Sequence, residues 1–116
     1  MKTSFLSVIA FVFVVAGAQP ACADEAAIAS GRKLAFEVCV SCHVVAPGEA
    51  GKPTLDPPAP SFAEIAARPD VTAASLRRFL AEPHGESRRG SAMPAFLLAR
   101  SEVNSVVAYL LSLKAR

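Results

Sequence analysis

Two thiols and an imidazole stand close together near the middle of this chain. Cys39 and Cys42 are three residues apart, and His43 follows the second cysteine directly. This C-x-x-C-H spacing is the attachment signature of a c-type haem. On one helical turn the two sulfurs can bond the two vinyl groups of one porphyrin, and the histidine can ligate the iron from one face. The sequence therefore predicts one haem, covalently bound through two thioethers.

Two other kinds of site use a C-x-x-C pair. Tetrahedral zinc usually needs four protein ligands, but after the motif the sequence offers no cysteine and one histidine, His84. A thioredoxin-like dithiol requires a βαβ context, and the sequence contains no convincing strand. Haem attachment is therefore the preferred interpretation of the motif.

An iron held by His43 needs a ligand on its other face. Met93 is followed by Pro94 in a loop, so its thioether does not belong to the apolar stripe of a helix. Because methionine and histidine together are a standard pair of haem ligands, Met93 is predicted to be the second one. His84 and an open or water-bound position are the alternatives.

The N-terminal residues have the pattern of an export signal. Lys2 precedes an apolar run over residues 5–18, and small residues close the segment at Ala21-Cys22-Ala23. This pattern predicts a signal peptide over residues 1–23, a mature domain over residues 24–116, and a periplasmic protein. The run is shorter than the roughly 20 residues that a membrane-spanning helix needs. Cleavage after residue 18, an uncleaved anchor, and lipid attachment at Cys22 are the alternatives.

Charge and size limit the class of protein. Twelve basic residues face ten acidic ones, giving a formal net charge of +2, without the clear basic excess of a nucleic-acid-binding domain. A domain of this size has a thin apolar core of its own, to which a buried porphyrin would add surface.

The elements that must position these residues read as helices. Residues 24–40 form the first and lead into the haem motif. A proline-rich loop over 46–60 is suited to covering one haem face. Ser61 opens a short helix ending near Arg68, with capping-box spacing to Glu64, and Thr72 caps a helix running to about Glu82. Ser101 is expected to cap the last helix, whose apolar face comprises Val103, Val106, Val107, Leu110 and Leu111. The fold class is all-α with a single domain.

The chain resembles the small class I c-type cytochromes exported by bacteria over nearly all of residues 26–116. The resemblance rests on Cys39, Cys42, His43, Met93-Pro94, the order of the helices, and Tyr109. It implies the class I fold, with about four helices around one covalently bound haem.

The resemblance also assigns roles to other residues. It implies that a glycine of the first helix, Gly31, meets an aromatic of the last, Tyr109, where the two helices cross. It further implies that a proline carbonyl accepts a hydrogen bond from the ligating histidine, and Pro60 matches best, with Pro58 in reserve. The family often has an aromatic four residues before the first cysteine, where this chain has Ala35.

This resemblance implies that the protein would be an electron carrier and not an enzyme. It would act as a monomer, without stable membrane insertion, and exchange electrons with a dehydrogenase, oxidase or reductase. A ligand-binding or peroxidase-like open-site haem protein, and a subunit of a larger periplasmic dehydrogenase, are the alternatives. Arg77-Arg78 and Arg88-Arg89 either dock an acidic partner or are ordinary solvated surface.

Overall fold

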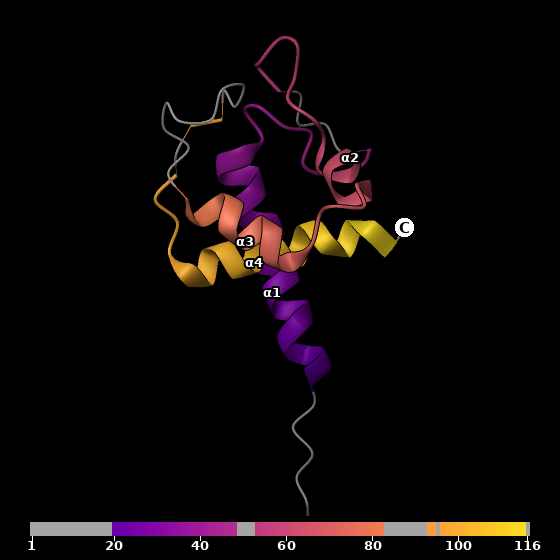
Figure 1. Cartoon of the computed structure of the whole chain (residues 1–116), viewed down its shortest axis with the longest axis vertical. Coiled ribbons are helices and arrows are strands. Elements are labelled where there is room, and N and C mark those ends of the chain that lie inside the picture. Colours follow the sequence, from indigo (N-terminus) through magenta and orange to yellow (C-terminus); the bar gives the residue numbers. More distant parts are fainter. Residues whose placement is uncertain (1–19, 49–52, 83–92, 95, 116) are drawn as a thin grey trace, which may run out of the picture.

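The computed structural model describes residues 20–48, 53–82, 93–94 and 96–115. Its helices are α1 (Pro20–Leu34), α2 (Phe62–Ala67), α3 (Ala73–Ala81) and α4 (Arg100–Ser112); a π-helical turn η1 (Ala35–Cys39) continues α1, and a 3-10 turn η2 (Leu113–Ala115) follows α4. Over these residues the structure has no strand, and an isolated bridge between His43 and Ala59 is the β-type pairing present. The prediction of an all-α domain with four helices is confirmed (Figure 1).

Two of the predicted helix starts are confirmed in detail. Ser61 Oγ accepts a hydrogen bond from the backbone N–H of Glu64, and the Glu64 carboxylate accepts one from the N–H of Ser61. The Glu64 carboxylate also accepts a hydrogen bond of 2.7 Å from the Ser61 hydroxyl, and this bond, followed by the one from the Ser61 N–H, lowers the pKa of Glu64. At α3, Thr72 and Ser75 exchange the same pair of bonds. Each box satisfies backbone donors that the first helical turn leaves unpaired.

The predicted start of the last helix is wrong. Ala99, not Ser101, is the N-cap, and α4 begins at Arg100. The N–H of Ala99 donates to the Glu102 carboxylate at 2.7 Å, so this donor is satisfied without a capping side chain at residue 99. Glutamate at the third helical position favours this start, because it also places a negative charge near the positive end of the helix.

The haem motif begins where α1 changes its hydrogen-bonding pattern. The N–H of Val40 donates to the carbonyl of Ala35, five residues back, and the N–H groups of Cys42 and His43 both donate to the carbonyl of Cys39. Ala35 is completely buried, whereas Phe36 is half-buried and lies 5.1 Å from the guanidinium carbon of Arg32. The alanine thus takes the core position on this helix, and the adjacent aromatic ring packs at its edge.

The first and last helices pack at close range, as the resemblance implied (Figure 1). Gly31 is buried between them. A Cβ atom on Gly31 would overlap the backbone carbonyl of Ser105 and would lie 2.9 Å from Tyr109 Cβ. The backbones can approach this closely because residue 31 has no side chain.

Tyr109 links α4 to the segment after the motif. Its hydroxyl donates a buried hydrogen bond of 2.8 Å to the carbonyl of Val45. Its ring packs against Phe62, with 6.2 Å between ring centroids. The buried core around this contact comprises Ala35, Val45, Phe62, Ala66, Val71, Leu76, Val103, Val106, Val107, Tyr109 and Leu110.

We expect Tyr109→Phe to lower the free energy of unfolding by about 1–3 kcal/mol, because the buried Val45 carbonyl would lose its partner while the ring stays in place. Denaturant titration of the oxidised protein measures this as a lower midpoint with an unchanged slope. An unchanged midpoint would show that water replaces the hydroxyl at no cost.

Several sequence predictions fall at or beyond the limits of the described residues. Residues 1–19, His84, Arg88 and Arg89 lie outside them. Helix α1 begins at Pro20, so the predicted cleavage point after residue 23 falls within its first turn. Among the described residues, the structure has no helix with the length and apolar character needed to cross a membrane.

Candidate functional site

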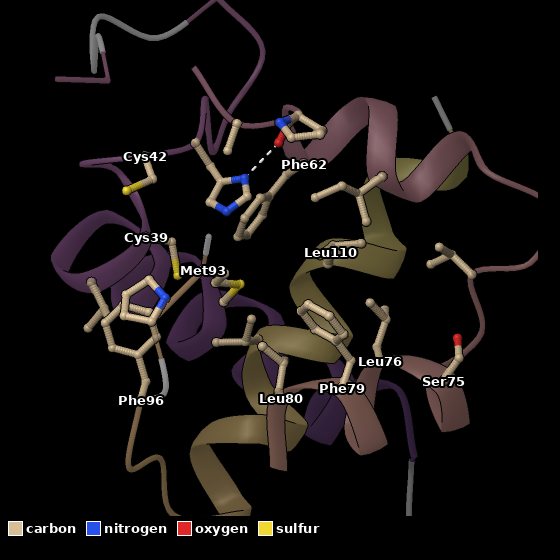
Figure 2. A pocket seen from close by; sticks show the side chains of 18 of the residues that line it. Cys39, Cys42, Phe62, Ser75, Leu76, Phe79, Leu80, Met93, Phe96 and Leu110 are labelled. Carbon is tan, nitrogen blue, oxygen red and sulfur yellow. Dashed lines mark hydrogen bonds between the residues drawn. The ribbon is translucent and has the colours of Figure 1, made fainter. Parts of the chain in front are cut away.

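A cavity of about 900 Å³ lies between the Cys39–His43 motif, the following loop, and helices α2, α3 and α4. Figure 2 shows Cys39 and Cys42 on one side of it and Ser75 on the other. Four of the five residues predicted to bind the cofactor line the cavity with side chains that carry sulfur or imidazole: Cys39, Cys42, His43 and Met93. The fifth, Pro60, also lines it. The fold therefore gathers all five around one space.

The orientation of His43 is fixed by the backbone of the loop. Its Nδ1 lies 2.6 Å from the carbonyl oxygen of Pro60, shown as the dashed line in Figure 2. A carbonyl can only accept, so Nδ1 carries the proton and Nε2 keeps its lone pair. The edge of the imidazole packs against Phe62, with 5.6 Å between ring centroids. The buried ring thus has one nitrogen engaged and one able to ligate a metal.

The proline-rich loop is held along the motif by backbone hydrogen bonds. The N–H of Thr54 donates to the carbonyl of Ser41 at 2.9 Å, and the N–H of Ala59 donates to that of Cys42 at 3.0 Å. A third bond, from the N–H of Phe62 to the carbonyl of Val44, ties the start of α2 to the same stretch. These contacts place the Pro60 carbonyl at the ring of the histidine.

Cys39 is the last residue of the π-helical turn, and Cys42 lies in the turn that follows. Cys39 is half-buried, and burial, followed by the charge of Cys42, raises the pKa of its thiol to about 11. The side chain is therefore a neutral thiol at physiological pH and is compatible with an apolar ligand beside it. Both cysteines line the cavity, and Figure 2 shows them on the same side of it.

Met93 lies at the same cavity as His43, although 50 residues separate them in the sequence. Its side chain is half-buried, and Figure 2 shows its sulfur directed into the space between the motif and α3. Pro94 lines the cavity next to it. Met93 lies outside the helices, so its thioether does not pack as part of an apolar helix face. Its sulfur is therefore available at the cavity as a soft donor.

The walls of the cavity are mostly apolar, and sequence reasoning found only part of them. Leu76, Phe79 and Leu80 have the spacing of one apolar helix face, which by itself does not distinguish a cavity wall from core. Neither Phe62 nor Phe96 stands in a sequence pattern that points to a site. The apolar wall comprises Val38, Leu55, Ile65, Val71, Leu76, Phe79, Leu80, Phe96, Val106 and Leu110, together with Phe62.

This donor set fits a covalently attached porphyrin. Two thiols one turn apart can form thioethers, an imidazole with Nδ1 engaged can present Nε2, and a thioether can supply a second axial donor. Most of the remaining wall is apolar, which suits the faces of a porphyrin, and its polar members are Ser41, Arg68, Asp70, Ser75, Arg78 and Glu82.

Comparison with known proteins gives a consistent result. The family model for cytochrome c matches residues 28–114. Cytochrome c-552 of Bradyrhizobium diazoefficiens is 42% identical over 84 residues, which cover 72% of this chain and 72% of that protein. No solved structure gives a significant match.

Proposed function

Because this chain belongs to the cytochrome c family, we propose that it carries single electrons in the periplasm, with its iron held between His43 and Met93. Cytochromes c transfer electrons through haem c, which is attached at a C-x-x-C-H motif, and Cys39, Cys42 and His43 have that spacing. Redox proteins are accordingly the partners of this family.

The observation that carries the proposal is the position of His43 and Met93 on one mostly apolar cavity. When bound there, haem would supply a one-electron couple between ferric and ferrous iron. Two protein ligands leave no open position for a substrate, so this arrangement favours transfer of electrons over catalysis. In the proposed function the protein is therefore an electron carrier and not an enzyme.

Each side chain at the cavity has a separate part in this function. The Pro60 carbonyl holds the imidazole ring and raises its basicity as a ligand. The soft sulfur of Met93 favours ferrous iron and so raises the potential relative to two histidines. The apolar wall formed by Phe62, Phe79 and Leu110 excludes water and disfavours the extra charge of the ferric state.

The proposal includes export. We infer that residues 1–23 form a signal peptide and that residues 24–116 form the cytochrome domain, which acts as a monomer. The family match supports this division because it begins at residue 28, after the proposed cleavage point. Lipid attachment at Cys22 is the alternative; mass spectrometry of the exported protein would separate the two by the presence or absence of acyl chains.

A redox titration of the purified, haem-loaded protein tests the carrier function. We expect a reversible one-electron transition, low-spin spectra in both states, and haem that remains attached after denaturation. A peroxidase-like or ligand-binding protein would instead give a high-spin ferric spectrum and bind cyanide or carbon monoxide readily. That result would contradict the proposal that the Met93 sulfur is the second axial ligand of the iron.

A further inference from the structure

A second, smaller hollow lies on the outer side of helices α3 and α4. It has a volume of about 620 Å³ and is formed by the end of α3, the start of α4 and the segment that precedes α4. We call it the α3–α4 groove. Its lining residues are Arg77, Arg78, Leu80, Ala81, Phe96, Leu97, Leu98, Arg100, Val103 and Asn104.

Among the described residues that line the α3–α4 groove, the charged ones are all arginines. Arg77, Arg78 and Arg100 are exposed, and none of the other described lining residues is a carboxylate. Arg77 Nε donates to Asn104 Oδ1 at 2.9 Å, which holds that side chain across the two helices. A chain whose overall charge is only +2 thus places three guanidinium groups around one hollow.

The α3–α4 groove also has apolar lining residues. Of these, Leu97 is fully exposed, and Ala81 is exposed as well. Burial of apolar surface of this kind stabilises protein association. Three arginines together with an exposed leucine suit a protein surface that combines carboxylates with an apolar patch, more than a purely polyanionic ligand.

The groove and the large cavity share part of their walls. Arg78, Leu80 and Phe96 line both spaces. Figure 2 shows Leu80 and Phe96 at the cavity, near Met93. A protein seated in the groove would therefore be separated from the cavity by a single layer of side chains, which is the close approach that electron exchange requires.

We propose that the α3–α4 groove is the docking site for an acidic redox protein, whose carboxylates would face the three arginines and whose apolar patch would cover Leu97. The inference rests on the proposed function and names the chemistry of its partner. In the step itself one electron leaves the reduced partner and reduces ferric iron to ferrous, or the reverse. Contacts of this kind are small and steered by charge, so they affect the association rate most strongly.

Stopped-flow oxidation of a reduced acidic flavodoxin by the ferric protein tests the docking site. We expect Arg100→Glu to lower the second-order rate constant by about fivefold or more at about 10 mM ionic strength, and by less than about twofold at about 500 mM. Lys33→Glu is the matched control because it makes the same charge change on α1, outside the groove. We expect it to change the logarithm of the rate constant by less than about half as much as Arg100→Glu does. Leu97→Ala should slow the reaction at both ionic strengths.

Other results would overturn the docking site. One is equal slowing by Arg100→Glu and Lys33→Glu, which would mean that only net charge matters; another is a wild-type rate that does not respond to salt. A wild-type dimer in sedimentation, dissociated by Leu97→Ala with no change in the flavodoxin rate, would assign the groove to a second copy of the chain. The midpoint potential of the wild type and of each variant is also measured by redox titration. Failure of that titration in the wild type contradicts the carrier function, whereas a normal titration with normal variant rates contradicts only the docking site.

Discussion

Replacing Met93 with leucine is expected to lower the midpoint potential by on the order of 0.1 V or more, a modest part of the ~0.8 V range that axial ligands span. Leucine nearly conserves the volume of methionine, so the wall of the cavity stays filled while the sulfur is lost. Without the thioether, ferrous iron loses the soft donor that stabilises it. The variant should also bind carbon monoxide and imidazole, which the wild type should resist.

Redox titration and ligand-binding spectra measure this effect. His84→Ala is the control, because His84 is the rival ligand in the sequence, and it should leave both the potential and the spectra unchanged. If Met93→Leu keeps the wild-type potential, Met93 only packs against the wall. If His84→Ala instead produces the loss, the second ligand is the histidine.

Gly31→Val is expected to cause the largest loss of stability of any substitution on α1. The new side chain would overlap the Ser105 carbonyl, and this neighbour is helix backbone, which cannot move aside as the end of a flexible side chain can. We expect the free energy of unfolding to fall by about 3 kcal/mol or more. For a domain of this size the melting temperature should drop by more than about 10 °C.

Ala29→Val provides the matched control for this substitution. Ala29 lies two residues earlier on the same helix with an exposed side chain. Its replacement should cost only the difference in helix propensity, below about 0.7 kcal/mol. Equal losses for the two variants, measured by thermal unfolding of haem-loaded protein, would mean that the contact between α1 and α4 yields to a larger residue.

The helices could be predicted well from the sequence because helix starts depend on residues only a few positions apart. The capping boxes at Ser61 and Thr72 depend on residues three apart, and both form as expected. The error at Ser101 has the same origin. Serine is a common capping residue, but the residue three positions after Ser101 is Asn104, whereas Ala99 has Glu102 at that spacing. Glutamate at the third helical position was the better signal.

The site was predictable where the chemistry is carried by adjacent residues. The C-x-x-C-H spacing identifies Cys39, Cys42 and His43, and the position of Met93 in a loop, outside any apolar helix face, identifies it as a candidate ligand. The packing of Phe62 on His43 depends on how α2 folds over the motif, which no short pattern contains. The same holds for the bond between Arg77 and Asn104, since it exists only once α3 and α4 have packed.

The partner of His43 Nδ1 is a main-chain atom, and this has a consequence for how the protein tolerates variation. No codon change at residue 60 deletes a carbonyl oxygen, so inherited substitutions can shift this acceptor only by reshaping the loop that carries it. The thioether of Met93, in contrast, vanishes with almost any single change. Differences in midpoint potential between natural variants should therefore arise from changes at Met93, while the hydrogen bond between His43 and the carbonyl of residue 60 stays nearly the same.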